Sequence, residues 1–462
     1  MAKLQKFIEL EQKNVFGEYD FFEIFKINFE NSELGRVKKL LPLSELAEKL
    51  GLKNKQYGKK RGRKSYFSPE GKVALMFLKM YTGLSFPKLM EQLNGNIYYQ
   101  LFCGVIIDPA NPMQNPKVLN DIALDLAERL KIQESQNVLA EAWKPYMENL
   151  DTMFTDATCY ESEMRFPTDP KLLWEGIEKT YDTMCTMCKA LGILRPRTKY
   201  LEVEKAYLTY RKTRKRNQKK IVRMTRRLLN LLGKLLANVR KIQRKHVDVD
   251  NLLTINKINE LDVVTKMYRQ QRNHFESGNR KESIKNRIVS LAKPYVRPIV
   301  RGKEPKIVEF VAKCNNIMVD GLSFIEKLSF NAFNEGKQLE HCIKMHKRLF
   351  GVDVKRMGAD TAYAGAENRK ICKDKIVTSF VKRGRPNTEE KTQDIERKEL
   401  ARARATKMEG SFGTQKEHYD LRRVKARKKK TEILYIFFGI HTANVVQLAK
   451  RVVEREKIAL VA

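Results

Sequence analysis

Apolar residues recur in short groups through the first 150 residues, a pattern that predicts helices. Leucines between Leu40 and Leu50 indicate short helices within residues 1–58. Residues 120–150 have the spacing of one or two amphipathic helices. Between them, glycines separate three apolar segments, 72–81, 86–93 and 98–102. A helix, a tight turn and a further helix are predicted, as in a helix-turn-helix unit or a plain helical bundle.

The period of the pattern changes at residues 153–160, which are β-branched and aromatic and predict a strand with Asp156 in its middle. From 171 to about 294 the helical spacing returns. One helix there carries apolar residues at steps of three and four, and 252–275 is predicted to be its partner. The same stripe is a candidate contact between subunits: Ile221, Met224, Leu228, Leu231, Leu235, Val239 and Ile242.

Strand patterns resume after residue 300 and alternate with two amphipathic helices, 337–349 and 394–418. The first strand is thus separated from the rest by a helical insertion of about 130 residues. This order predicts an α/β core, a mixed sheet flanked by helices, interrupted by a helical domain. The later strands are predicted at 307–312, 316–319, 324–330, 352–359 and 375–380.

Charge narrows the class of protein. The 462 residues contain 91 Lys and Arg against 55 Asp and Glu, a net charge of +36, while 42% are hydrophobic. This excludes an acidic or neutral housekeeping enzyme and a disordered basic tail. The excess is concentrated in 53–64, in 416–430 and in 205–245, where sixteen Lys or Arg occur without an acid. One such run is usually a solvated face, but three predict a nucleic-acid partner.

The expected cellular location and the cysteines narrow the class of protein less than the charge does. The longest apolar run, Ile433 to Ile440, is far below the roughly 18 residues of a membrane span, and acids near the N-terminus argue against a signal peptide. We expect a cytoplasmic protein without a membrane partner. The 7 cysteines show no disulfide spacing. Cys185 and Cys188 lack a second ligand pair for zinc and are interpreted as helix residues.

Three acids have contexts that suggest chemistry. Asp156 lies within a predicted strand, where an unpaired carboxylate is costly. Asp360 ends a predicted strand, a position at which α/β sheets place ligand groups. Glu409 lies on a predicted helix, with Lys416 seven residues later on nearly the same face. Oxygen ligands suit Mg²⁺, and two such ions can cleave a phosphodiester. The alternative for each acid is a helix cap or a salt bridge.

Several segments together resemble the DDE transposases of bacterial insertion sequences, in the branch around the IS-five and related groups. They are TDATCYESEMRFPTDPKLL, VEFVAKCNNIMVDG, MGADTAYAGAENRKIC, TSFVKRGRP and EGSFGTQKEHYDLRRVKARKKKTEILYIFFGIHTAN. The resemblance covers 151–462 and, more loosely, 59–105. It implies an RNase H-like catalytic core in which Asp156, Asp360 and Glu409 are catalytic and bind two Mg²⁺ ions, which Mn²⁺ can replace.

The sequence departs from that family at one position. Related transposases often have an Arg four residues before the Glu, where this chain has Ala405, with Arg402, Arg404 and Lys407 nearby. Lys416 is retained as a phosphate contact. The RGRP segment within 382–386 is similar to a minor-groove hook, although a basic loop explains it equally well. His418 and His441 are interpreted as structural.

The resemblance implies a DNA transposase that binds terminal inverted repeats, hydrolyses a strand at each end and transfers it to target DNA. Double-stranded DNA is the expected partner of a homodimer or larger synaptic complex, without a small-molecule substrate. A catalytically silent regulator and an RNA-binding structural protein are the alternatives. The predicted domains are 1–110 (helical, DNA-binding), 111–150 (linker), 151–170 (first strand of the core), 171–300 (basic helical insertion) and 301–462 (remainder of the core). The predicted DNA contacts are Lys416, Lys60, Arg61, Arg63, Lys64, Arg211, Lys212, Arg214, Lys215, Arg216, Arg383, Arg385, Arg422 and Arg423.

Overall fold

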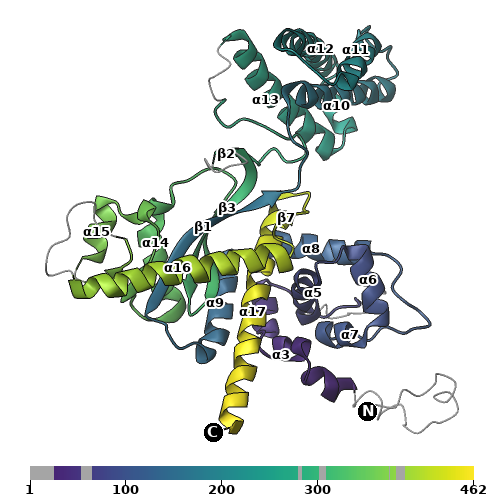
Figure 1. Cartoon of the computed structure of the whole chain (residues 1–462). Helices are drawn as coiled ribbons and strands as arrows, with labels where there is room; N and C mark the ends of the chain where they lie inside the picture. Colours follow the sequence, from purple (N-terminus) through teal and green to yellow (C-terminus); the bar gives the residue numbers. More distant parts are fainter. Residues whose placement is uncertain are drawn as a thin grey trace. The chain divides into compact units, whose positions relative to one another are not determined.

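A computed structural model describes residues 25–53, 65–278, 284–300, 308–373, 375–380 and 391–461 (Figure 1). The chain divides into two compact units. The first comprises Met1–Glu161, Lys313–Ser329 and Phe333–Ala462, and the second comprises Ser162–Ala312 and Phe330–Ala332. Each unit has its own core and is described by itself.

The first unit begins with a helical bundle around α5. The Ser68 side chain caps α5 by accepting from the Gly71 amide, and α5 ends at Gly83, whose φ of 63° is favourable only for glycine. Residues on every face of α5 are buried, so it is the central helix of this bundle. The helix breaks predicted at the two glycines are observed. The helices are α3 (Glu33–Lys39), α4 (Leu43–Lys49), α5 (Pro69–Thr82), α6 (Phe86–Gly95), α7 (Ile97–Cys103), α8 (Lys117–Arg129) and α9 (Ile132–Trp143).

The sheet is mixed. β1 lies between β3 and β5, β6 continues beyond β5, and β4 pairs with β3 on the other side. β5 runs parallel to both β1 and β6, whereas β3 and β4 are antiparallel. The two strands predicted at 307–312 and 316–319 are one continuous strand, β3. The bounds are β1 (Thr152–Ser162), β3 (Val308–Val319), β4 (Leu322–Ser329), β5 (Arg356–Gly358), β6 (Val377–Thr378) and β7 (Arg423–Val424), which pairs with β1.

Two long helices complete the first unit, α16 (Lys391–His418) and α17 (Lys429–Val461), with α14 (Leu339–Phe350) packed against β4 and α9. Figure 1 shows α16 crossing the sheet. The Lys429–Ala459 stretch is long and apolar enough to span a membrane, but 89% of its apolar window is buried inside the protein. It is a core helix, and His441 lies buried in it among the rings of Trp143, Phe324 and Phe437.

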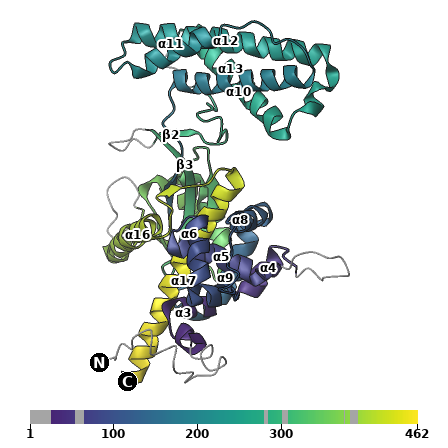
Figure 2. The same cartoon turned by 90° about the vertical axis from the view of Figure 1, so that its right-hand side faces the viewer.

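The second unit is a bundle of α10 (Asp169–Ala190), α11 (Tyr200–Lys212), α12 (Gln218–Lys245) and α13 (Ile255–Glu276) (Figure 2). The predicted stripe of α12 is confirmed as core, because Leu228 and Leu235 are fully buried. Its main partner is α10, with α13 second. The proposal that this stripe joins two subunits is therefore wrong, since its own unit already covers it.

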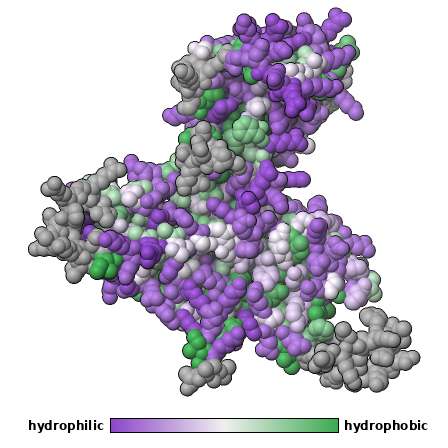
Figure 3. Space-filling model, in the orientation of Figure 1, coloured by the Kyte–Doolittle hydropathy of each residue, from purple (hydrophilic) through white to green (hydrophobic). Residues whose placement is uncertain are grey.

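One further expectation for this region is wrong, and one is confirmed. Its helices end at Glu276, and residues 284–297 contain no helix. The short strand β2 (Pro298–Val300) then pairs with the N-terminal part of β3. Cys185 and Cys188 lie on α10 with free thiols, as helix residues. Hydrophilic residues dominate the face of this bundle shown in Figure 3.

Candidate active site

Asp156 lies within β1, and Asp360 lies just after the end of β5, the parallel neighbour of β1. The β1–β5 register pairs Phe154 with Gly358, and each aspartate lies two residues beyond its member of this pair. Paired strands are about 4.8 Å apart, so the two backbones are close at this level. The charge of Asp360 also contributes to raising the pKa of Asp156. Two acids that are about 200 residues apart in the sequence are thus brought together.

The carboxylate of Asp156 is largely enclosed. Burial is the main cause that raises its pKa above the ordinary value, and the nearby charges of Glu335 and Asp360 act in the same direction. Arg404 opposes this shift, because its Nη1 lies 2.5 Å from Asp156 Oδ2 and both side chains are only 17% exposed. The Ala157 amide donates to the other oxygen at 2.7 Å. Asp156 is therefore neutralised by a guanidinium in this structure.

Helix α16 supplies that arginine because of the face it turns to the sheet. Its apolar residues pack with Phe154 and Met318: Leu400, Met408 and Phe412. Arg404 lies on the same stripe, and so does Gln415, whose Oε1 accepts from the Tyr160 hydroxyl at 2.6 Å. Gly358 lies under both groups: a Cβ there would lie 2.3 Å from the Phe154 ring on β1 and 3.1 Å from the Leu400 carbonyl oxygen on α16.

Glu409 lies outside that stripe and is exposed. Five residues after Arg404 correspond to a rotation of about 140° around the helix axis. The structure therefore brings Asp156 and Asp360 together, whereas Glu409 lies on a different face of α16 from the one that contacts Asp156. Lys416 is half-buried, one residue after the fully buried Gln415.

The fit to a metal is partial. The carboxylate oxygens of Asp156 and Asp360 have the chemistry that Mg²⁺ prefers. Within the described ranges, however, no three His, Cys, Asp or Glu side chains are grouped so as to hold a metal ion. Glu335 is close enough to influence Asp156 but pairs with Lys313 at 2.8 Å. A third acidic ligand does not join the two aspartates in this conformation.

The predicted DNA contacts differ in their exposure to solvent and in their neighbours. Five are exposed where α11 ends and α12 begins: Arg211, Lys212, Arg214, Lys215 and Arg216. The Arg216 guanidinium lies 4.7 Å from the Tyr210 ring centroid. Arg422 and Arg423 are exposed near β7, and Arg422 pairs with Glu417 at 3.3 Å. Lys60, Arg61, Arg63, Lys64, Arg383 and Arg385 lie outside the described residues.

Sequence reasoning missed the role of two residues. Arg404 was seen only as a neighbour of Ala405, although it follows Leu400 and precedes Met408 by four residues each, the spacing of one helix face. No sequence pattern indicated that Glu335 lies near Asp156, because this proximity depends on the folded path of the segment after β4.

The chain matches a known family over part of its length. Residues 23–122 match the family described as "Transposase domain (DUF772)". Comparisons with curated proteins and with solved structures gave no match. The matched residues form most of the helical bundle around α5 and stop short of the sheet. The match supports a transposase in general, an enzyme that cleaves and transfers DNA.

Proposed function

We propose that this protein is a DDE transposase of an insertion sequence, which cleaves the ends of its element with Asp156, Asp360 and Glu409 and joins them to target DNA. The observation that carries the proposal is the placement of Asp156 within β1 and of Asp360 two residues after the end of β5, at the same level of the β1–β5 register. Asp360 follows the carboxyl end of β5, where α/β sheets place ligand groups, and Asp156 lies on the neighbouring strand at the same level.

The sheet order supports an RNase H-like core. The order is β2-β3-β1-β5-β6, and β4 also pairs with β3. β1, β5 and β6 are parallel, and β3 and β4 are antiparallel to each other. The first Asp lies on the first strand, the second follows a parallel neighbour of that strand, and the helix carrying Glu409 crosses the sheet. The second unit interrupts the core between β1 and β3, as a basic insertion would.

In the proposed reaction, two Mg²⁺ ions would supply activation of a water and stabilisation of the leaving oxygen. Asp156 and Asp360 would hold them, with Glu409 as the proposed third ligand. Lys416 would contact the neighbouring phosphate. The cations at the α11–α12 junction would hold the DNA backbone, and synapsis of two ends would involve at least a dimer. Each phosphate contact releases counterions and adds affinity.

The test is cleavage of duplex DNA that carries the inverted repeats flanking the coding sequence. Asp156→Asn, Asp360→Asn and Glu409→Gln keep the side-chain shape and remove the charge. We expect wild-type protein to nick this DNA with Mg²⁺ or Mn²⁺ and each variant to lose nicking while keeping DNA affinity. Glu399→Gln, an exposed acid on the same helix, is the matched control and should keep full activity. An active Glu409→Gln protein would refute that assignment.

One observation favours a second function, a silent DNA-binding regulator derived from a transposase. Arg404 already neutralises Asp156, as in a purely structural ion pair. For a regulator, wild-type protein would bind the repeats at ~150 mM salt with nanomolar affinity and yet nick neither strand with any divalent cation. Nicking by wild-type protein excludes this reading.

A further inference from the structure

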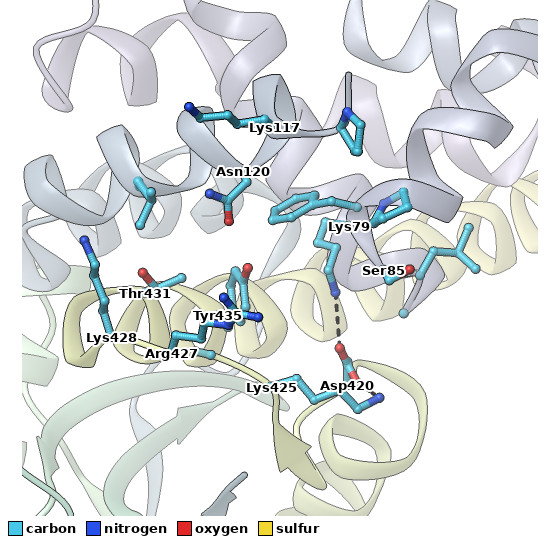
Figure 4. Close-up of a pocket in the computed structure, with 17 residues that line it drawn as sticks. Lys79, Ser85, Lys117, Asn120, Asp420, Lys425, Arg427, Lys428, Thr431 and Tyr435 are labelled. Carbon is cyan, nitrogen blue, oxygen red and sulfur yellow. Dashed lines mark hydrogen bonds and ion pairs between the residues drawn. The ribbon is translucent and has the colours of Figure 1, made fainter. Parts of the chain in front are cut away.

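The first unit contains a cavity away from the aspartates, with a volume of about 630 Å³. Its walls come from α5, α6, α8 and the segment from Asp420 into α17. Figure 4 shows Thr431 and Tyr435 on one wall and Lys117 and Asn120 on the opposite wall. The volume lies within the range of about 300–1,000 Å³ typical of sites for small organic ligands. The proposed transposition chemistry requires no ligand here.

Three helices begin at this cavity. Ser85 and Phe86 lie at the start of α6, Pro116 and Lys117 at the start of α8, and Lys428 and Thr431 around the first turn of α17. Each helix has at least ten residues, and each N-terminus carries a partial positive charge. Neither Ser85 nor Pro116 caps its helix through a side chain. Convergence of three such ends favours a bound anion.

The side chains that line the cavity add to this field. One acid faces five cations there: Asp420 against Lys79, Lys117, Lys425, Arg427 and Lys428. Asp420 is already engaged, because its carboxylate lies 3.1 Å from Lys79 Nζ and 3.8 Å from Lys425 Nζ. Lys117, Arg427 and Lys428 are exposed along the cavity. Among the described residues that line it, the balance of charge is therefore strongly positive.

A buried hydroxyl lies in the same wall. Thr431 is only 7% exposed, and its Oγ1 has no hydrogen-bond partner within the protein. An unpartnered buried hydroxyl is costly, and such groups usually have a partner such as water or a ligand. The rest of the wall is apolar and includes the rings of Phe86 and Tyr435. A phosphate alone would leave most of this space unfilled.

We propose that this cavity binds one nucleotide, with its phosphate at the three helix N-termini and the Thr431 hydroxyl, and its base against the apolar wall. Aromatic and proline faces accept any base, whereas the cations require the phosphate. The nucleotide can be free in solution or be one unit of a DNA strand turned into the cavity. Both sources present the same phosphate, sugar and base.

The experiment measures binding of dAMP, deoxyadenosine and a 20-nucleotide single strand to full-length protein by calorimetry. We expect dAMP or the strand to bind wild-type protein, and deoxyadenosine to bind at least tenfold more weakly than dAMP. Thr431→Val removes the hydroxyl without changing shape or charge, and should weaken binding of the phosphate-bearing probes about tenfold, the usual effect of losing one hydrogen bond to a charged group. Arg427→Gln should do the same.

Two controls make the result decisive. Lys457→Gln removes an exposed cation on α17, 26 residues after Thr431 and about 39 Å away at 1.5 Å per residue, and should leave binding unchanged. Thermal melting checks folding, and Thr431→Val should melt no lower than wild type, because the hydroxyl has no partner. Loss confined to dAMP identifies a free nucleotide, and loss confined to the strand identifies a DNA unit. Unchanged affinity of both probes in Thr431→Val, or no binding to wild type, overturns the proposal. DNA nicking is independent of either result.

Discussion

Replacing Arg404 by Met should destabilise the first unit in a pH-dependent way. The variant keeps the packed stem of the side chain but removes the charge paired with Asp156. Both partners are only 17% exposed, so the carboxylate is left buried without its countercharge. Breaking a fully buried pair costs about 3–5 kcal/mol, and the residual exposure places this pair at the lower end, about 3 kcal/mol at pH 7. For a large domain this lowers Tm by roughly 6–12 °C.

The pH dependence follows from the direction of the Asp156 shift. Burial raises the pKa of Asp156 above the unfolded value of 3.8, and Arg404 partly opposes this rise. A raised carboxyl pKa stabilises the fold below the unfolded pKa, and the contribution is lost as pH increases through the folded pKa. Without Arg404 the folded pKa is higher, so the loss extends further. The deficit of the variant should therefore be small near pH 4 and grow toward pH 8.

The assay is chemical denaturation of wild type, Arg404→Met and Arg402→Met from pH 4 to pH 8. Arg402 is exposed on the same helix, and its replacement should change stability by less than about 0.5 kcal/mol. An Arg404→Met deficit that is absent, or equal at both ends of the range, would show that the ion pair does not compensate a buried charge.

Three further outcomes are expected. Gly358→Ala should lower stability by about 1–3 kcal/mol in denaturant titration, because its Cβ would lie 2.3 Å from the Phe154 ring. Unchanged stability would mean that the Phe154 ring can move aside to make room for the methyl group. Burial lowers the pKa of His441 to about 3, so the contribution of the neutral ring to wild-type stability is complete above pH 6.5 and falls by about 2–3 kcal/mol by pH 4.5. His441→Phe should lack this loss when stability is measured in an acid titration. Lys215→Gln with Arg216→Gln should weaken DNA binding at all sequences and reduce the slope of log K against log salt by about two; an unchanged slope would exclude phosphate contacts there.

The sequence predicted most of the elements around the site but not their contacts. The β-branched run with Asp156, the apolar stripe of α12 and the helix carrying Glu409 were all evident from periodicity. The pairing of β1 with β5 was not, because register between strands about 200 residues apart depends on packing that no local pattern encodes. The α10 partner of α12 was missed for the same reason, since α10 and α13 both carry apolar residues of suitable spacing.

The orientation of α16 could have been predicted, because the apolar residues define its buried face. Leu400, Met408 and Phe412 follow a spacing that includes Arg404 and excludes Glu409. The length of the buried helix α17 was not evident from the sequence for a different reason: polar residues interrupt its apolar run after Ile440. Asn444 is nonetheless buried, since it exchanges two hydrogen bonds with the backbone of Ser323 on β4, at 2.9 and 2.7 Å. Satisfied polar groups make a core helix look amphipathic in sequence.

The arrangement around Asp156 shows how a protein of net charge +36 maintains an acidic site. Burial and the neighbouring carboxylates of Glu335 and Asp360 all disfavour the charged form of Asp156. A cation must therefore offset them whenever Asp156 is ionised, and in this structure that cation is Arg404. Under the proposed function, a divalent ion ligated by the same oxygens would offset the same charges, so Arg404 and the ion would be alternatives at Asp156.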